Sequence, residues 1–345
     1  MQALLLSQYR HLEVADLPKP EPGPDEVLIR VAACGICGSD VHGYDGSSGR
    51  RIPPIVMGHE AAGVIAAVGK DARNFREGER VTFDSTIYCG ACANCLRGDI
   101  NLCDSRQVVG VSCGDYRRAG AFAEYVAVPA RIVYRLPEIL PFEEAAMIEA
   151  VSVALHAVSL VKVAPQNNSL VIGAGMIGLL IVQALHAAGC SHVWISDVDQ
   201  SRLNLAQEFG ALGLCAGPGL AAQVNEITDG AGMDLIIEAV GIDATVSAAI
   251  ASVRKGGDVV LVGNVAPEVT LPLQKVVTRQ IRLQGSCASA GEYPRAIELM
   301  SSGAIRVKPL ITAIAPLEEG PRWFERLYAH EPNLMKIVLS PGRVS

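Results

Sequence analysis

The stretch Ser169-Leu-Val-Ile-Gly-Ala-Gly-Met-Ile-Gly178 decides the fold class of this chain. A short apolar run typical of a buried strand leads directly into a G-x-G-x-x-G set, and a helical pattern follows. In this context the glycines predict a dinucleotide-binding turn. Gly173 permits the tight bend, Gly175 lets the backbone approach a pyrophosphate, and Gly178 lets the helix pack closely on the strand. The helix start, with Met176 and Ile177, offers free N–H groups to the phosphates.

The residues after this stretch alternate between strand and helix patterns. We expect strands over 170–172, 192–196, 234–238 and 258–262, with helices over 176–188 and 201–210 between the first of them. Such alternation predicts an α/β domain of the Rossmann type, with a doubly wound parallel sheet. A hydropathy window over 170–188 would also suit a membrane span, but its three glycines, Gln183 and His186 favour the strand–turn–helix interpretation.

Asp197 ends the second strand, about 20 residues past the last glycine, where the dinucleotide fold places a ribose-binding carboxylate. A carboxylate there would repel a 2′-phosphate, so we expect NAD rather than NADP. Alternatively, Asp197 only caps the turn 196–199. Arg202 either packs against the adenine or is a solvated helix charge. Further candidates for cofactor contact are Val262, Gly263, Ser286 and Cys287.

A β-rich domain precedes the dinucleotide-binding domain. The first part of the chain is rich in Gly, Pro and short β-favouring runs such as 26–31 and 122–128. We expect this domain over 1–155, the dinucleotide-binding domain over 156–288, and a return of 289–345 to the first domain.

The composition excludes several classes of partner. The 345 residues are 50% hydrophobic and 19% charged, with a formal net charge of −7 and no basic cluster. A nucleic-acid or anionic-membrane surface is therefore not expected. The start of the chain shows no signal-peptide pattern, so we expect a cytoplasmic protein. In that reducing setting, clustered cysteines favour metal binding over disulfides.

Four cysteines lie within 15 residues, at positions 89, 92, 95 and 103. Thiolates at such short spacing can surround one tetrahedral zinc ion, and a site with four cysteine ligands leaves no position for a substrate. We therefore expect Cys89, Cys92, Cys95 and Cys103 to form a structural zinc site in a lobe over about 86–106. An iron–sulfur cluster or disulfides are the alternatives, but the usual cluster spacing is missing.

A second, more dispersed group consists of Cys37, His59, Glu60 and Glu149. A thiolate, an imidazole and a carboxylate could hold zinc and leave one position open for Lewis-acid catalysis. Spacing alone does not establish this site, because a His-Glu pair is more often ordinary polar structure.

Three motifs in order resemble the zinc-containing medium-chain alcohol dehydrogenases over essentially the whole chain. They are Cys37-Gly-Ser-Asp-Val-His42, Gly58-His-Glu-Ala-Ala-Gly63, and the cysteine quartet followed by the glycine fingerprint. The resemblance implies a GroES-like catalytic domain. It also implies two zinc ions per chain, with the catalytic ion held by Cys37, His59 and a carboxylate. Glu60 and Glu149 would exchange, or one would bind through water. Ser39 and His42 match the family's proton relay.

Within the family, the carboxylates Glu60 and Glu149 resemble the sorbitol, threonine and butanediol dehydrogenase branch. We expect oxidation of a secondary alcohol, with a polyol or sugar alcohol favoured. L-threonine, 2,3-butanediol and a sugar phosphate such as galactitol 1-phosphate are the alternatives. Ala150 and the run 286–289 depart from the sorbitol dehydrogenase pattern. Two other classes, a non-enzymatic nucleotide-binding zinc protein and a zinc-free quinone or enoyl reductase, fit the motifs less well.

The resemblance also implies a homodimer or homotetramer. We expect a β-rich edge over 269–284 to pair with a second copy across a twofold axis.

Overall fold

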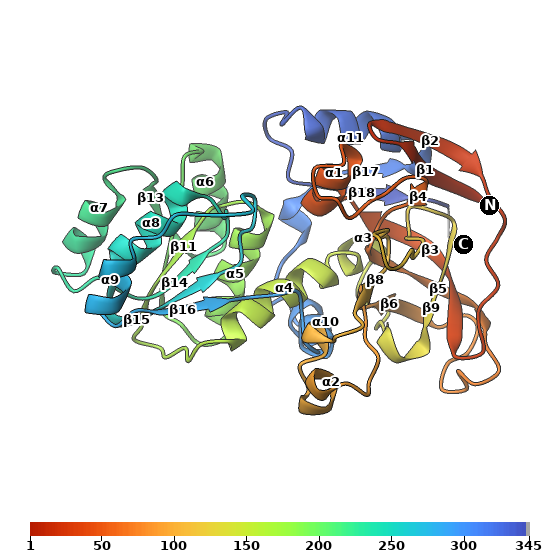
Figure 1. Ribbon diagram of the computed structural model, residues 1–345, viewed down its shortest axis with the longest axis horizontal. Coiled ribbons are helices and arrows are strands. Elements are labelled where there is room, and N and C mark those ends of the chain that lie inside the picture. Colours follow the sequence, from red (N-terminus) through yellow and green to blue (C-terminus); the bar gives the residue numbers. More distant parts are fainter. Residues whose placement is uncertain (343–345) are drawn as a thin grey trace. The chain divides into compact units, whose positions relative to one another are not determined.

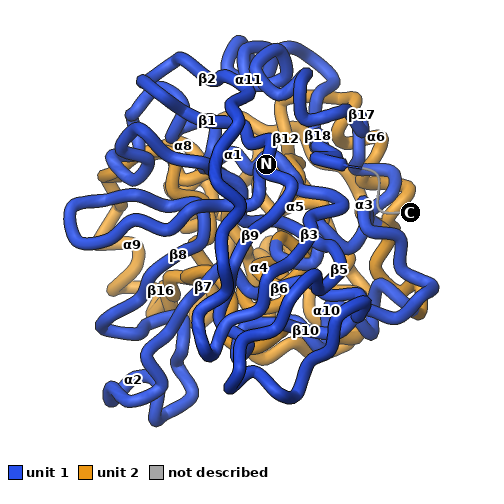
Figure 2. The backbone as a smooth tube through the Cα atoms, turned by 90° about the vertical axis from the view of Figure 1, so that its right-hand side faces the viewer, with its two compact units in different colours: residues 1–149, 293–301, 307–345 blue, residues 150–292, 302–306 orange. Residues whose placement is uncertain are grey.

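The computed structural model describes residues 1–342, which divide into two compact units (Figure 2). Unit 1 contains Met1–Glu149, Tyr293–Ser301 and the residues from Val307 onward, and unit 2 contains Ala150–Glu292 and Ser302–Arg306. The chain passes from unit 1 to unit 2 within helix α4 (Ile148–Ser159) and returns at α10 (Tyr293–Ser301).

Unit 2 is built on a sheet of six parallel strands in the order β13-β12-β11-β14-β15-β16 (Figure 1). This is the doubly wound order in which the chain builds one half of the sheet, returns to the first strand and builds the other half. The expected Rossmann fold is confirmed. The strands are β11 (Asn168–Ile172), β12 (His192–Asp197), β13 (Leu212–Cys215), β14 (Met233–Glu238), β15 (Val253–Leu261) and β16 (Arg282–Gly285). The helices are α5 (Met176–Ala187), α6 (Gln200–Glu208), α7 (Leu220–Ile227), α8 (Asp243–Ser252) and α9 (Leu273–Thr278).

The apolar segment 170–188 divides into strand β11 and helix α5, and both are core elements. Leu170 and Val171 are fully buried in the sheet, as are Leu179 and Leu180 on the helix. Their high hydropathy therefore reflects burial on all sides within the unit. Among the described residues, no helix is long and apolar enough to cross a membrane.

The expectation of a β-rich stretch over 269–284 was wrong, because the middle of this stretch, Leu273–Thr278, forms helix α9. Pro272 caps the helix α9, and only Arg282–Gly285 at the end of the stretch form a strand. The β-branched pair Val276 and Val277 suggested a strand, but their packing decided otherwise. Val276 packs against the core of unit 2, whereas Val277 is largely exposed, as expected for neighbouring residues on a helix.

Unit 1 contains a seven-stranded sheet along the path β10-β6-β5-β3-β18-β17, with β9 also paired to β3. A three-stranded sheet (β2-β1-β4) and a two-stranded ribbon (β7-β8) complete its β structure. The strands are β1 (Gln2–Gln8), β2 (His11–Asp16), β3 (Glu26–Gly35), β4 (Ile55–Val56), β5 (Glu60–Val68), β6 (Arg80–Phe83), β7 (Thr86–Ile87), β8 (Gln107–Val108), β9 (Tyr125–Pro129), β10 (Val133–Arg135), β17 (Ile311–Pro316) and β18 (Lys336–Ser340).

The helices of unit 1 are short and lie between or beside these strands. They are α1 (Gly38–Tyr44), α2 (Ala93–Arg97), α3 (Phe142–Ala145), α10 and α11 (Gly320–Tyr328). Short 3₁₀ segments are η1 (Ile100–Leu102), η2 (Ala130–Ile132), η3 (Lys308–Leu310) and η4 (Leu317–Glu319). Tyr44 at the end of α1 contacts Phe324 of α11, with ring centroids 5.8 Å apart. Phe324 meets Phe122 edge-on at 5.7 Å. This aromatic cluster anchors α1, which carries two of the candidate site residues.

Candidate active site

Strand pairing in unit 1 brings Cys37, His59 and Glu60 together. β3 ends at Gly35, which pairs with Glu60 at the start of β5, so Cys37 lies beside His59 and Glu60. One donor atom from each of the three lies within 4.8 Å of the others. A side chain on Gly35 would place its Cβ 2.4 Å from Oε2 of Glu60, so this position requires glycine. The thiolate, imidazole and carboxylate form a donor set that suits zinc.

Glu60 is wholly buried and forms an ion pair with Lys336. The Nζ of Lys336 donates to Oε2 of Glu60 at 2.5 Å and to the carbonyl oxygen of Ile36 at 3.0 Å. Burial opposes the charge on Lys336, but the Glu60 carboxylate outweighs it and raises the Lys336 pKa. Oε1 of Glu60 has no hydrogen-bond partner among the described residues. Because a buried carboxylate oxygen needs a partner, this free oxygen fits a metal ligand.

Asp40 holds the His59 ring from behind. Its Oδ1 lies 3.3 Å from Nδ1 of His59, and its Oδ2 accepts the Cys37 N–H at 3.2 Å. Burial would raise the pKa of Asp40, but His59 and Arg51 lower it to about 2. Burial likewise opposes the charged His59 ring, yet Asp40 raises the His59 pKa well above its usual value. A carboxylate that fixes the tautomer of a metal-binding histidine is a common arrangement.

Glu149 lies near the three donors but outside their 4.8 Å group. The Ser85 hydroxyl donates to its Oε1 at 3.3 Å. Burial raises the pKa of Glu149, His59 lowers it, and Glu60 raises it further. Glu149 lies in the first turn of α4, whereas Glu60 is the first residue of strand β5.

Ser39 and His42 lie three residues apart on α1 and therefore face the same side of the helix. Both are exposed, whereas Asp40 between them is buried. The helix thus turns a hydroxyl and an imidazole outward while it directs a carboxylate toward His59.

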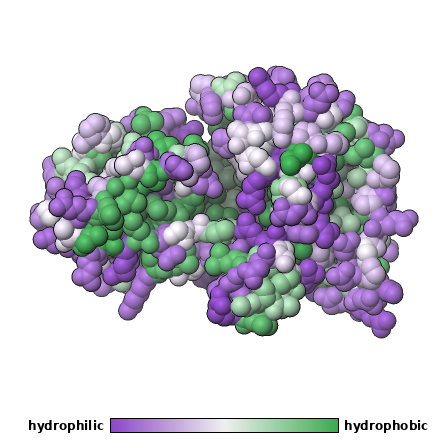
Figure 3. Space-filling view, viewed as in Figure 1, coloured by the Kyte–Doolittle hydropathy of each residue, from purple (hydrophilic) through white to green (hydrophobic). Residues whose placement is uncertain are grey.

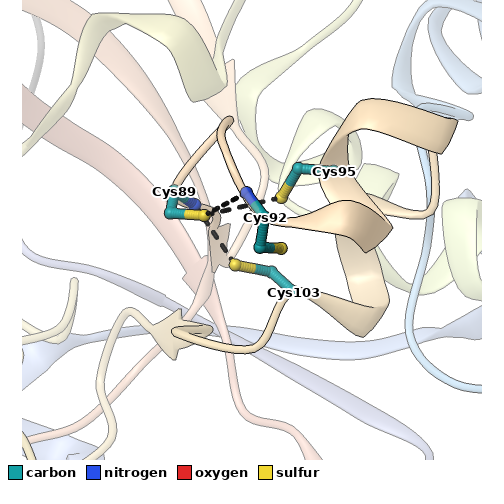
Figure 4. A group of neighbouring side chains, drawn as sticks. All are labelled: Cys89, Cys92, Cys95 and Cys103. Carbon is teal, nitrogen blue, oxygen red and sulfur yellow. Dashed lines mark hydrogen bonds between the residues drawn. The ribbon is translucent and has the colours of Figure 1, made fainter.

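The cysteine quartet converges in a small lobe formed by α2 and η1 (Figure 4). Donor atoms of Cys89, Cys92, Cys95 and Cys103 all lie within 4.8 Å of one another, and none of these cysteines forms a disulfide. The sulfurs of Cys89 and Cys95 are 3.9 Å apart. Tetrahedral zinc with bonds of about 2.3 Å separates its sulfurs by about 3.8 Å. The geometry therefore suits one ion.

Backbone hydrogen bonds prepare this lobe for thiolates. The N–H groups of Ala91 and Cys92 point at the Cys89 sulfur, at 3.4 and 3.3 Å, and lower the pKa of Cys89 to about 6. Desolvation instead raises the pKa of Cys95 to about 12. A thiol with so high a pKa needs a cation to lose its proton at neutral pH.

In unit 2 the glycine turn lies at the carboxyl end of β11, where Met176 and Ile177 begin α5. A Cβ on Gly178 would lie 1.8 Å from the carbonyl oxygen of Gly173, so the helix can pack this closely only with glycine. The Ala174 N–H in this turn donates to Oδ2 of Asp197 at 2.6 Å. Asp197 thus contacts the glycine turn directly.

Asp197 also accepts the Asp199 N–H at 2.9 Å through its Oδ1. It therefore caps its own turn, so the two interpretations of this residue are compatible. Arg202 is partly exposed and forms a 3.7 Å ion pair with Asp199, the N-cap of α6.

The other cofactor candidates follow the carboxyl ends of β15 and β16. The N–H groups of Val262 and Gly263 both donate to the Glu238 carbonyl, at 2.8 and 3.1 Å. The Ser286 N–H donates to the Leu261 carbonyl at 2.9 Å, and Cys287 is exposed. These residues share the edge of the sheet at which the glycine turn lies, since all six strands are parallel.

Sequence reasoning missed the buried carboxylate of Glu238 at the end of β14. Its Oε1 accepts the N–H groups of Val240 and Gly241, at 2.9 and 2.8 Å, and so shapes the loop beside the glycine turn. Asp40 and Lys336 were also missed. Asp40 lies inside the motif 37–42, which could have revealed it, whereas no local signal points to Lys336.

Two family models match the chain. The alcohol dehydrogenase GroES-like domain matches residues 23–138, and the zinc-binding dehydrogenase domain matches residues 177–302. Sorbitol dehydrogenase of Bacillus subtilis is 34% identical over 349 residues, covering 99% of this chain and 98% of that protein. The chain belongs to the zinc-containing medium-chain alcohol dehydrogenases. It is an oxidoreductase, and the expected family and fold are confirmed.

Other relatives agree with this assignment. L-idonate 5-dehydrogenase of Vitis vinifera is 35% identical over 90% of this chain and 86% of that protein. An oxidoreductase of unknown specificity from Escherichia coli superposes with a TM-score of 0.93 at 32% identity, covering 98% of both chains. A zinc-binding dehydrogenase of Sinorhizobium meliloti 1021, solved with NADP bound, gives a TM-score of 0.89 at 31% identity over 99% of both chains. A nicotinamide cofactor and zinc are therefore properties of the family.

Proposed function

We propose that this dehydrogenase oxidises a secondary hydroxyl of a polyol or sugar alcohol to a ketone, with NAD as the acceptor. One observation carries the proposal. Cys37, His59 and Glu60 offer three different donor types within 4.8 Å, and Glu60 keeps one buried oxygen without a partner. Three protein ligands leave a fourth tetrahedral position for the substrate oxygen.

Zinc held at this site would supply a Lewis acid that lowers the pKa of an alcohol, and a bound nicotinamide would supply the hydride acceptor. The chain's own residues then manage the proton. The exposed Ser39 hydroxyl accepts the proton from the substrate, and His42, on the same face of α1, passes it toward solvent. Asp40 keeps the His59 ring in one tautomer throughout.

We propose Glu60 as the direct carboxylate ligand, because it lies within the three-donor group and Glu149 does not. Glu149, which accepts a hydrogen bond from Ser85, would then replace Glu60 as a ligand or bind the ion through water. Cys89, Cys92, Cys95 and Cys103 hold a second, structural zinc, so the chain carries two ions.

The choice of NAD rests on Asp197. Its carboxylate follows β12 and touches the glycine turn, and its negative charge opposes a 2′-phosphate. Arg202, the cation nearest to this carboxylate in sequence, is engaged with Asp199. Because a relative was solved with NADP bound, the preference of this chain for NAD over NADP must be measured directly.

A neutral substrate is favoured over a sugar phosphate, because three arginines of unit 1 that could bind a phosphate already have partners. Arg51 is buried and pairs with Asp40 at 3.2 Å. Arg117 donates to the Pro54 carbonyl, and Arg118 pairs with Glu26 at 3.5 Å. The relatives named for sorbitol and L-idonate also act on polyhydroxylated carbon chains.

We further propose that a second copy covers an apolar patch on unit 2, defined by Val265, Leu271, Leu273 and Val277. These residues are 62%, 36%, 65% and 68% exposed. Figure 3 shows apolar surface over the part of unit 2 that carries α8 and α9. β16 is also an edge strand of the six-stranded sheet, so its outer hydrogen-bonding groups can pair with another chain.

A turnover screen with zinc quantified alongside tests the function. We expect two zinc ions per chain and NAD reduction with polyols, faster than with galactitol 1-phosphate, 2,3-butanediol or L-threonine. NADP in place of NAD tests the cofactor. Protein purified without chelators that held one zinc, in the cysteine quartet alone, would contradict the proposal.

A further inference from the structure

Arg51 is a buried cation beside the candidate active site, and the proposed chemistry gives it no role. Only 4% of its surface is exposed. Its Nη2 donates to Oδ1 of Asp40 at 3.2 Å and to the Ser39 hydroxyl oxygen at 3.4 Å. One guanidinium nitrogen thus contacts both the carboxylate behind His59 and the hydroxyl of the proposed relay.

The contact with Asp40 matters because Asp40 positions two of the proposed zinc ligands. It accepts the Cys37 N–H and holds Nδ1 of His59, and it is wholly buried. A histidine that binds zinc is neutral, so it cannot balance the charge of Asp40. Arg51 is then the cation in contact with this carboxylate. Without it, a buried charge would keep no ionic partner, which is strongly destabilising.

The contact with Ser39 fixes the direction of a hydroxyl group. Arg51 donates to the serine oxygen and so occupies one of its lone pairs. The hydroxyl hydrogen must then point away from Arg51. Because Ser39 is otherwise exposed, its free lone pair and its hydrogen remain available to substrate and to the relay.

Arg51 is itself rigidly held. The backbone on both sides of it bonds to Ser112, with Ile52 N–H donating to the Ser112 carbonyl at 3.0 Å and Ser112 N–H donating to the Arg50 carbonyl at 3.2 Å. Its stem crosses α1 at Gly43, where a Cβ would lie 2.1 Å from Cγ of Arg51. Gly43 has an ordinary backbone conformation, so it is glycine because the arginine needs the space.

We propose that Arg51 is a positioning residue: laid across Gly43, it orients Ser39 and, through Asp40, the His59 ring. The proposal rests on the proposed function, because it gives Arg51 a purpose only if His59 binds zinc and Ser39 accepts a proton. The proposal adds Arg51, from the loop before β4, to the active-site residues that α1 and β5 carry.

Removing the guanidinium is the first test. In Arg51→Met we expect zinc to leave the Cys37–His59–Glu60 site for a chelator roughly tenfold to a hundredfold faster, and kcat to fall by a similar factor. The visible bands of cobalt(II) placed in that site should change, while NAD affinity and the quartet zinc stay unchanged. Arg51→Lys should recover part of the loss, because it restores the charge but not the planar fork.

Gly43→Ala provides a second test that leaves Arg51 in the chain. The new methyl group would displace the arginine stem. This variant should therefore show the same changes as Arg51→Met, an altered cobalt spectrum and faster zinc release, but smaller in size. Arg135→Met, at an exposed ion pair with Glu79, controls for the loss of an arginine. Gly219→Ala, with open space around its Cβ, controls for the added methyl group.

The outcomes separate clearly. Folded Arg51→Met and Gly43→Ala proteins with wild-type zinc release, cobalt spectrum and kcat would overturn the proposal. If Arg51→Met does not fold, Arg51→Lys and Gly43→Ala carry the same measurements. The proposed function fails differently, through a wild-type protein that holds no ion at this site and oxidises no alcohol.

Discussion

At the scale of single residues, the His59 ring is where a proton and a metal ion compete. Asp40 raises the His59 pKa although burial opposes the charged ring, so the metal-free ring keeps its proton to a higher pH than an ordinary histidine does. Metal binding must displace that proton. We therefore expect zinc affinity at the catalytic site to rise with pH, by at least about tenfold per pH unit while the His59 ring is protonated, and to fall on acidification.

Competition with a chelator at several pH values measures this dependence. Cys37→Ser, which lacks one ligand, reports the quartet alone and serves as the reference. An affinity independent of pH would mean that the His59 ring is already neutral before the metal binds.

Asp197 is the residue that should decide the cofactor. Asp197→Ala removes the carboxylate proposed to accept the ribose hydroxyls, so the Kd for NAD should rise roughly tenfold or more. The Kd for NADP should rise less, because the repulsion of its 2′-phosphate disappears as well. Fluorescence titration with both cofactors checks this, with Asp258→Ala as the control at an ion pair with Arg282 on the same sheet. Equal losses for both cofactors would contradict the assignment.

At the scale of elements, the lobe of α2 and η1 buries little apolar surface: α2 has no buried residue, and Leu96 and Leu102 are largely exposed. A bound ion would therefore supply the stability that a core supplies elsewhere. In Cys92→Ser we expect one zinc ion fewer per chain and an unfolding free energy lower by about 3 kcal/mol or more. The ion at the catalytic site should remain.

Metal analysis and thermal unfolding measure both effects, and Cys215→Ser at an exposed cysteine outside the lobe is the matched control. Unchanged zinc content in Cys92→Ser would rule out the quartet as a zinc site.

The elements also show what sequence can and cannot reveal. The β11–α5 turn and the quartet were predictable because each is encoded in a few adjacent residues with a fixed spacing. α9 was not, since Val276 and Val277 favour a strand locally and only packing against unit 2 makes them helical. The partner of Glu60 was beyond reach, because Lys336 lies 276 residues away and only the pairing of β18 with β3 brings it near.

At the scale of the whole molecule, the apolar patch on unit 2 should control assembly. Leu273→Glu combined with Val277→Glu would place charges on the patch, and we expect the dimer or tetramer to dissociate into single chains. Light scattering at several concentrations measures the mass. Leu96→Glu, at a residue 75% exposed on the zinc lobe, adds a charge to an apolar site outside the patch. A wild-type protein with the mass of one chain would refute the proposed pairing.

The place of Lys336 in the chain has a consequence for biosynthesis. The sheet that supports Cys37, His59 and Glu60 takes β18 from Lys336–Ser340, whereas the residues of unit 2 leave the ribosome earlier. During translation, Glu60 therefore stays without its ammonium partner until nearly the entire polypeptide has emerged. Insertion of the catalytic ion into its finished coordination sphere is accordingly among the last steps of maturation, after the cysteine lobe has had all four of its thiols available for some 230 residues of further synthesis.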